Sequence, residues 1–125
     1  MPQILFVMLG GAIGAAGRHL VGRAMIAAMG PGYPWGTLTA NILGGLFMGL
    51  LVGVLSRLSA PGESLRLFLA VGVLGGFTTF SSFSLDAVNM MERGDWIVAL
   101  GYVLVSVIAS IGAVAAGLGI VRGVA

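Results

Sequence analysis

The sequence predicts an all-α integral membrane protein, with four transmembrane helices in a single domain over residues 1–125. Two observations support this prediction. Of the 125 residues, 58% are hydrophobic and 8% are charged, and the mean hydropathy is +1.11, whereas a soluble domain of this size needs more charges on its surface. The apolar residues fall into four long segments separated by short polar turns. The chain has no cysteine, which excludes disulfides, thiolate metal sites and a cysteine nucleophile.

The first two transmembrane helices are expected over residues 3–29 and about 35–56. The first contains a run of small residues from Gly10 to Gly17, and such residues let another helix approach closely. The stretch from Gly30 to Pro34 has the glycine and proline content of a turn. Trp35 then opens the second segment, at a position that aromatic residues favour near the membrane surface.

The third and fourth helices are expected over about 65–91 and about 95–120. A loop over residues 57–64 precedes the third helix, and the polar turn Glu92–Asp95 separates the two. Trp96 again marks the membrane surface. Each of the four segments has at least about 20 residues, which is long enough to cross a hydrocarbon core of roughly 30 Å. We therefore predict four spans with both termini on one side of the membrane.

The third segment has an unusual centre at residues 75–84. Two glycines are followed by three phenylalanines and five hydroxyl side chains. Glycine, serine and threonine are poor helix formers, so we expect the helix to be broken near 75–81. Non-helical backbone at membrane depth is tolerated only where it is buried in protein or lines a wet cavity. The break therefore indicates a functional site, and the alternative is that these residues serve only in packing between helices.

The positive charges are divided evenly between the two ends of the predicted bundle. All six are arginines. Arg23 and Arg93 lie on one side, Arg18 leans the same way, and three lie on the side of the termini: Arg57, Arg66 and Arg122. Topology usually follows an excess of Lys and Arg on the cytoplasmic side. Without that excess we expect insertion in both orientations and an antiparallel, dual-topology homodimer; one fixed orientation is the alternative. Arginines scattered singly form no nucleic-acid patch.

Polar side chains recur on three of the predicted helices. Thr37 and Asn41 are four residues apart and share one face of the second helix. The fourth helix carries a stripe of donors at Tyr102, Ser106 and Ser110. One such stripe is typical of packing between helices, but these two stripes together with the hydroxyls of the third helix favour a polar pathway.

The missing charges indicate which kind of ion would use such a pathway. No Asp or Glu lies near the centre of a span, whereas a proton-coupled cation exporter needs one there. Hydroxyl and amide donors, with Arg18, favour a small anion, which can also pass the positive ring edges of Phe80 and Phe83. Arg18 has two other interpretations: it extends to the interface or caps a helix. His19 is interpreted as an interfacial polar residue, and the sequence contains no catalytic or nucleotide-binding motif, so we predict no enzyme.

Four motifs are similar to those of the Fluc (CrcB) family of bacterial fluoride channels, and the resemblance covers essentially the whole chain. The motifs are Gly14-x-x-x-Arg18, Trp35-Gly36-Thr37-Leu38-x-x-Asn41 with Gly44-Gly45, the stretch 75–84, and Gly101-Tyr102. The resemblance implies a fluoride-selective passive channel of the bacterial inner membrane, crossing it several times. It further implies a dual-topology homodimer with two pores that exports toxic fluoride from the cytoplasm.

The resemblance also assigns roles to individual residues. Asn41 would be a pore-lining donor, and Phe80 and Phe83 would line the fluoride path edge-on. Tyr102 would line the vestibule side, Arg18 would add positive potential at the entrance, and hydroxyls would lie along the path at Thr37, Thr79, Ser81, Ser82, Ser84 and Ser110. A structural sodium ion shared by both subunits would bind the backbone carbonyls of Gly75 and Thr78, since carbonyl oxygens suit a hard cation.

Two other classes of function stay open on the sequence. The first is a dual-topology multidrug exporter of similar size, which the missing central glutamate disfavours. The second is an assembly subunit that transports nothing and whose polar stripes serve only in helix packing.

Overall fold

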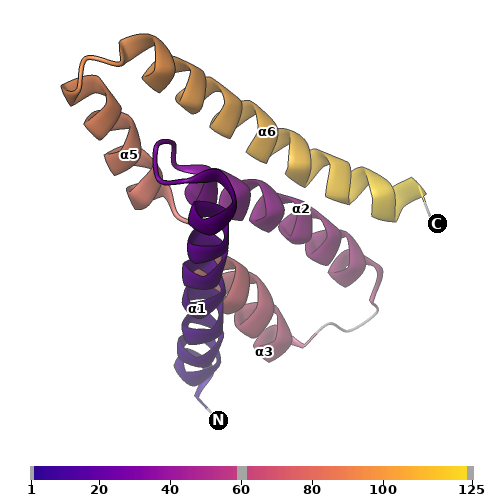
Figure 1. Cartoon of the computed structure of the whole chain (residues 1–125). Helices are drawn as coiled ribbons and strands as arrows, with labels where there is room; N and C mark the ends of the chain where they lie inside the picture. The colour runs from indigo at the N-terminus through magenta and orange to yellow at the C-terminus, as the bar shows by residue number, and fades with distance from the viewer. Residues whose placement is uncertain (1, 59–61, 124–125) are drawn as a thin grey trace.

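The computed structural model describes residues 2–58 and 62–123, and within them every regular element is a helix. The elements are α1 (Gln3–Met29), α2 (Trp35–Arg57), α3 (Glu63–Arg66), the π-helix η1 (Leu67–Leu74), α4 (Gly75–Phe77), α5 (Phe80–Glu92) and α6 (Trp96–Gly123) (Figure 1). The predicted all-helical class is confirmed. Part of the loop expected over 57–64 lies outside the described residues.

Four helical stretches are long and apolar enough to cross a membrane: Gln3–Met29, Trp35–Arg57, Glu63–Glu92 and Trp96–Gly123. The predicted number of membrane-capable segments is therefore confirmed. The third stretch joins α3, η1, α4 and α5, and its first half contains eight residues with π-helical hydrogen bonds, a feature that the apolar pattern does not predict.

Two glycines set the turns between long helices. Gly30 follows α1 with φ 81°, and its N–H donates to the Ile26 carbonyl at 2.8 Å. Gly94, with φ 86°, lies between α5 and α6. Glycine adopts positive φ without steric cost, so both helices end there and the chain reverses.

Close helix contacts depend on residues without a Cβ atom. The helices α2 and α6 run side by side (Figure 1), and a Cβ at Gly49 of α2 would overlap the Val114 carbonyl of α6. In the same way α1 contacts η1, where a Cβ at Gly72 would lie 2.9 Å from the Gly10 Cα. These contacts bring backbones together, as is common between helices in membranes.

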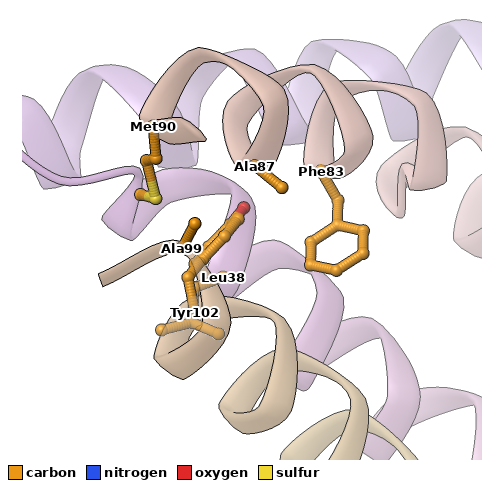
Figure 2. Close-up of a cluster of buried hydrophobic side chains, with 6 residues drawn as sticks. All are labelled: Leu38, Phe83, Ala87, Met90, Ala99 and Tyr102. Carbon is orange, nitrogen blue, oxygen red and sulfur yellow. The ribbon is translucent and has the colours of Figure 1, made fainter. Parts of the chain in front are cut away.

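A cluster of buried side chains lies where α2, α5 and α6 meet (Figure 2). The cluster consists of Leu38, Phe83, Ala87, Met90, Ala99 and Tyr102. Many large apolar side chains elsewhere point outward, for example Ile97 and Ile108 of α6. An outer surface of this kind suits contact with hydrocarbon or with another subunit.

Candidate functional site

The backbone is extended at Thr78 and Thr79, between α4 and α5. Thr78 has φ −85° and ψ 161°, and Thr79 has φ −154° and ψ 124°. The N–H of Thr78 still donates to the Leu74 carbonyl at 3.0 Å, and its hydroxyl donates to the same oxygen at 3.1 Å. We call Thr78–Thr79 the extended segment. The N–H of Thr79 makes no helical hydrogen bond and donates to a side chain instead.

Asn41 of α2 contacts both polar backbone groups of Thr79. Its Oδ1 accepts a hydrogen bond from the Thr79 N–H at 2.8 Å, and its Nδ2 donates to the Thr79 carbonyl at 2.9 Å. The opposite orientation of the carboxamide would place donor against donor and acceptor against acceptor, so the hydrogen bonds define the orientation. One of the two Nδ2 hydrogens is used in this pairing.

Hydroxyl groups stabilise the first turn of α5. The Thr79 Oγ1 accepts from the Ser82 N–H at 3.1 Å, which makes Thr79 the N-cap of the helix. The same oxygen lies 3.4 Å from the Ser81 Oγ, and the Ser84 hydroxyl donates to the Phe80 carbonyl at 2.9 Å. Several predicted pathway hydroxyls thus have local partners within one turn.

Arg18 of α1 points at the carboxyl end of α4. Its Nε donates to the Gly76 carbonyl at 3.4 Å, and the side chain is half-buried. A guanidinium at this place satisfies a carbonyl at a helix end and complements the partial negative charge there. The sequence left several interpretations open for Arg18, and the contact in this structure agrees with the one in which it caps a helix.

A cavity of about 480 Å³ lies beside the extended segment, between α2, the start of α5 and α6. Six of the residues predicted for the site line it: Asn41, Thr78, Thr79, Phe80, Phe83 and Ser110. The lining contains no Asp, Glu, Lys or Arg. Phe80 is 77% exposed and lies at the outer edge of the subunit, whereas Phe83 is buried.

Ser106 also lines this cavity. The sequence placed it in the donor stripe of the fourth helix, but the roles that the family resemblance implied did not include it. The residue is 5% exposed, and its Oγ has no hydrogen-bond partner among the residues that the structure describes. A buried hydroxyl without a partner is unusual and needs an explanation. The sequence signal was its spacing of four residues from both Tyr102 and Ser110.

Aromatic contacts continue from this cavity toward the 30–35 turn. The ring centroids of Phe80 and Phe83 are 5.5 Å apart, those of Phe83 and Tyr102 are 5.2 Å apart, and those of Tyr102 and Tyr33 are 5.6 Å apart. The fully buried Tyr102 donates its hydroxyl to Asp86 Oδ2 at 3.1 Å. A second cavity of about 280 Å³ beyond it is lined by Thr37, Asp86 and the turn.

Not all predicted residues meet at one place. Thr37 lines the second cavity, Tyr102 lies between the two cavities, and five others lie outside both linings: Arg18, Gly75, Ser81, Ser82 and Ser84. Gly75 is exposed and Thr78 is half-buried. The described residues contain no group of three His, Cys, Asp or Glu side chains able to hold a metal ion, so any cation at this place would depend on backbone oxygens.

A family model described as "CrcB-like protein, Camphor Resistance (CrcB)" matches residues 5–118. The chain belongs to this CrcB family. The match includes every residue of the larger cavity, together with Arg18 and Thr37. The family resemblance that the motifs predicted is confirmed.

Relatives from several bacteria align with nearly the whole chain. The protein named fluoride-specific ion channel FluC of Sphingopyxis alaskensis is 52% identical over 122 residues, which are 98% of this chain and 97% of that protein. Proteins of the same name from Agrobacterium fabrum and Mesorhizobium japonicum are 51% and 48% identical, each over 98% of both chains. With the four membrane-capable helices, this establishes a multi-pass membrane protein. Ion channels are not enzymes, so the predicted lack of enzymatic activity is confirmed.

Proposed function

We propose that this chain forms a fluoride-selective passive ion channel. The observation that carries the proposal is the larger cavity, which combines hydroxyl and amide donors with two phenyl rings and no carboxylate. Such a lining suits a small anion and disfavours a proton-coupled exporter of organic cations. The relatives named fluoride-specific ion channels support fluoride as that anion.

The cavity offers fluoride replacements for lost water. Fluoride is small and strongly hydrated, so its path needs closely spaced, well-directed donors. Ser106 has a hydroxyl without a partner, Asn41 has a second Nδ2 hydrogen, and Phe80 and Phe83 offer positive ring edges. In this proposal the path is completed by Arg18 near its entrance and by the polar side chains of Thr37, Thr79, Ser81, Ser82, Ser84, Tyr102 and Ser110.

The proposed assembly is an antiparallel homodimer of subunits inserted in both orientations, with two pores. The evenly divided arginines support two orientations. The exposure of Phe80, at the edge of the cavity, supports a second subunit that covers this face and completes the path. Glu63–Glu92 would then cross the membrane as one span broken at the extended segment. In a bacterial inner membrane, passive flux through such pores would carry accumulated fluoride out of the cytoplasm.

A sodium ion at the extended segment belongs to the same proposal, and the residues there fit it. In an unbroken helix the Thr79 N–H would bond the Gly75 carbonyl, but it bonds Asn41 instead. This leaves the Gly75 carbonyl, on an exposed residue, available to a cation, and the Thr78 carbonyl lies three residues further along, where the extended segment begins. Backbone oxygens suit a hard cation such as Na⁺. When bound, the ion would supply positive charge that neutralises carbonyl dipoles from both subunits.

One observation favours a second candidate, an assembly subunit that conducts nothing. The hydroxyls of Thr79 and Ser84 and the carboxamide of Asn41 are bonded within the chain, as a packing role requires. The unpartnered hydroxyl of Ser106 argues for the channel, because packing alone gives no reason to bury it.

Efflux from liposomes that contain the purified protein tests the proposal. Fluoride- and chloride-sensitive electrodes would follow the efflux of both ions once the membrane potential that opposes it is dissipated. We expect rapid fluoride release with chloride retained. Release of neither ion by folded, dimeric protein would favour the assembly subunit, and equal release of both would contradict the selectivity.

A further inference from the structure

We infer that Asn41 is a positioning residue, which holds Thr79 in its extended conformation and thereby sets where Phe80 and α5 begin. This goes beyond a role as a donor that lines the cavity. The consequence for ion passage rests on the proposed function, but the conformational role does not.

The pairing of Asn41 with Thr79 selects an extended backbone. In an extended residue the N–H and C=O groups point to the same side, as in the hydrogen-bonded pairs of an antiparallel sheet. In a helix they point in opposite directions along the axis. One planar carboxamide reaches both groups of Thr79, at 2.8 Å and 2.9 Å, because φ is −154° and ψ is 124°. A helical Thr79 would lose at least one of the two bonds.

The extended segment is contacted from two other sides of the same chain. Arg18 of α1 donates to the Gly76 carbonyl just before it. Gly44 of α2 leaves room for Thr78, since a Cβ there would overlap the Thr78 Cγ2. Thr79 then caps α5 through the Ser82 N–H. Every one of these contacts is made within one subunit.

The loss of Asn41 would leave two polar backbone groups of Thr79 without partners in an apolar surrounding. A free N–H and C=O at membrane depth are costly. The chain would reduce this cost by a helical Thr79, which displaces Phe80, the next residue, or by water in the cavity, which leaves Thr79 without the carboxamide that holds it extended. Asn41 thus acts on the ring at the cavity edge through the backbone that precedes it.

Nuclear magnetic resonance of ¹⁵N,¹³C-labelled protein in lipid nanodiscs tests this inference without any flux measurement. In the wild-type protein we expect a correlation across the hydrogen bond between the Thr79 ¹⁵N and the Asn41 ¹³Cγ, in the absence of fluoride. We expect it to persist when fluoride is added. A missing correlation, or one that fluoride abolishes, would overturn the inference and leave Asn41 as a ligand only.

Amide exchange in substituted proteins gives the second test. Asn41→Ala should accelerate exchange of the Thr79 amide by about five- to tenfold, the factor expected for one hydrogen bond of ordinary net strength. Asn89→Ala removes the other asparagine, an exposed residue of α5, and should leave that rate unchanged. Asn41→Asp keeps the acceptor and loses the donor, so the Thr79 amide should stay protected while its carbonyl ¹³C signal moves. Unchanged exchange in Asn41→Ala, or lost protection in Asn41→Asp, would overturn the inference.

These measurements separate the inference from the proposed function. A wild-type protein that shows the correlation but releases no fluoride from liposomes would overturn the channel and keep the role of Asn41. A wild-type protein that conducts fluoride without the correlation would do the reverse.

Discussion

Replacing Gly44 by alanine tests whether the extended segment packs against α2 as described. A Cβ at Gly44 would overlap the Cγ2 of Thr78 and lie 3.4 Å from a ring carbon of Phe77. Thr78 cannot rotate freely, because its hydroxyl donates to the Leu74 carbonyl at 3.1 Å. Rotation would give up that bond, worth about 1 kcal/mol, and a shift of the backbone would strain the pairing with Asn41. We expect Gly44→Ala to lower the free energy of unfolding by about 1–3 kcal/mol, as overpacking commonly does.

A second substitution isolates the contact. Thr78→Ser removes the methyl group that the new Cβ would meet and keeps the hydroxyl, at a cost of about 0.8 kcal/mol. The double variant should therefore recover most of the stability lost in Gly44→Ala, with a coupling of about 1 kcal/mol or more. Gly119→Ala is the matched control, since nothing lies within 4 Å of a Cβ there. Denaturation in detergent at one protein concentration, followed by tryptophan fluorescence, measures the wild type and the four variants. Additive effects of the two substitutions would refute the contact.

Four further predictions concern single side chains. Phe80→Ile should abolish fluoride efflux, because it removes a ring edge, and should leave the dimer intact by gel filtration. Phe47→Ile, on the exposed side of α2, should not abolish efflux. Retained flux in Phe80→Ile would count against the role of the ring. Asn41→Asp should block efflux, because it adds a negative charge at the cavity, and undiminished flux would place Asn41 away from the path. Ser106→Ala should leave the unfolding free energy unchanged or raise it by about 1 kcal/mol, since an unpaired hydroxyl is removed. The same substitution should reduce fluoride efflux. Unchanged efflux would indicate a role in packing only. Burial raises the pKa of Tyr33 above its ordinary value of 10.0, so the folded protein holds this proton more tightly. Stability should then decline as the pH rises from about 10 through the raised pKa, a decline that Tyr33→Phe should lessen in pH-dependent unfolding.

The helices were predictable because they follow from local chemistry. Long apolar segments interrupted by glycine and proline leave few alternatives in lipid, where only helices and closed barrels satisfy the backbone. Gly30 and Gly94 end helices through their positive φ, and both lie in stretches that composition already marks as turns. The N-cap at Thr79 also had a local signal, because threonine is a favoured N-cap residue and Thr79 lies in a stretch of poor helix formers, three residues before Ser82.

The contacts that shape the site were not predictable, because they join distant parts of the chain. Asn41 and Thr79 are 38 residues apart, and Arg18 and Gly76 are 58 residues apart. No periodicity links such pairs. The π-helical hydrogen bonds of Leu67–Leu74 likewise have no sign in an apolar sequence, and this segment contacts α1 where Gly10 and Gly72 bring the backbones together. Hydrogen-bond register there depends on packing that a single sequence does not display.

The same contacts reduce the number of polar residues at the site that are free to bind an ion. A non-helical segment at membrane depth needs partners for its own backbone and for the helix ends beside it. Here the carboxamide of Asn41 bonds Thr79 itself, and the guanidinium of Arg18 and the hydroxyl of Thr79 bond the adjoining ends of α4 and α5. The sequence pattern counts all of these groups as possible ligands of a passing anion. The structure leaves fewer at the larger cavity: one hydrogen of Asn41 and the hydroxyls of Ser106 and Ser110. If the chain conducts fluoride, most of its conspicuous polar residues build the path, and a smaller set with free donors binds the ion. Ser106 is the sharpest test of that division, because its hydroxyl has no partner among the described residues that would explain its burial in any other way.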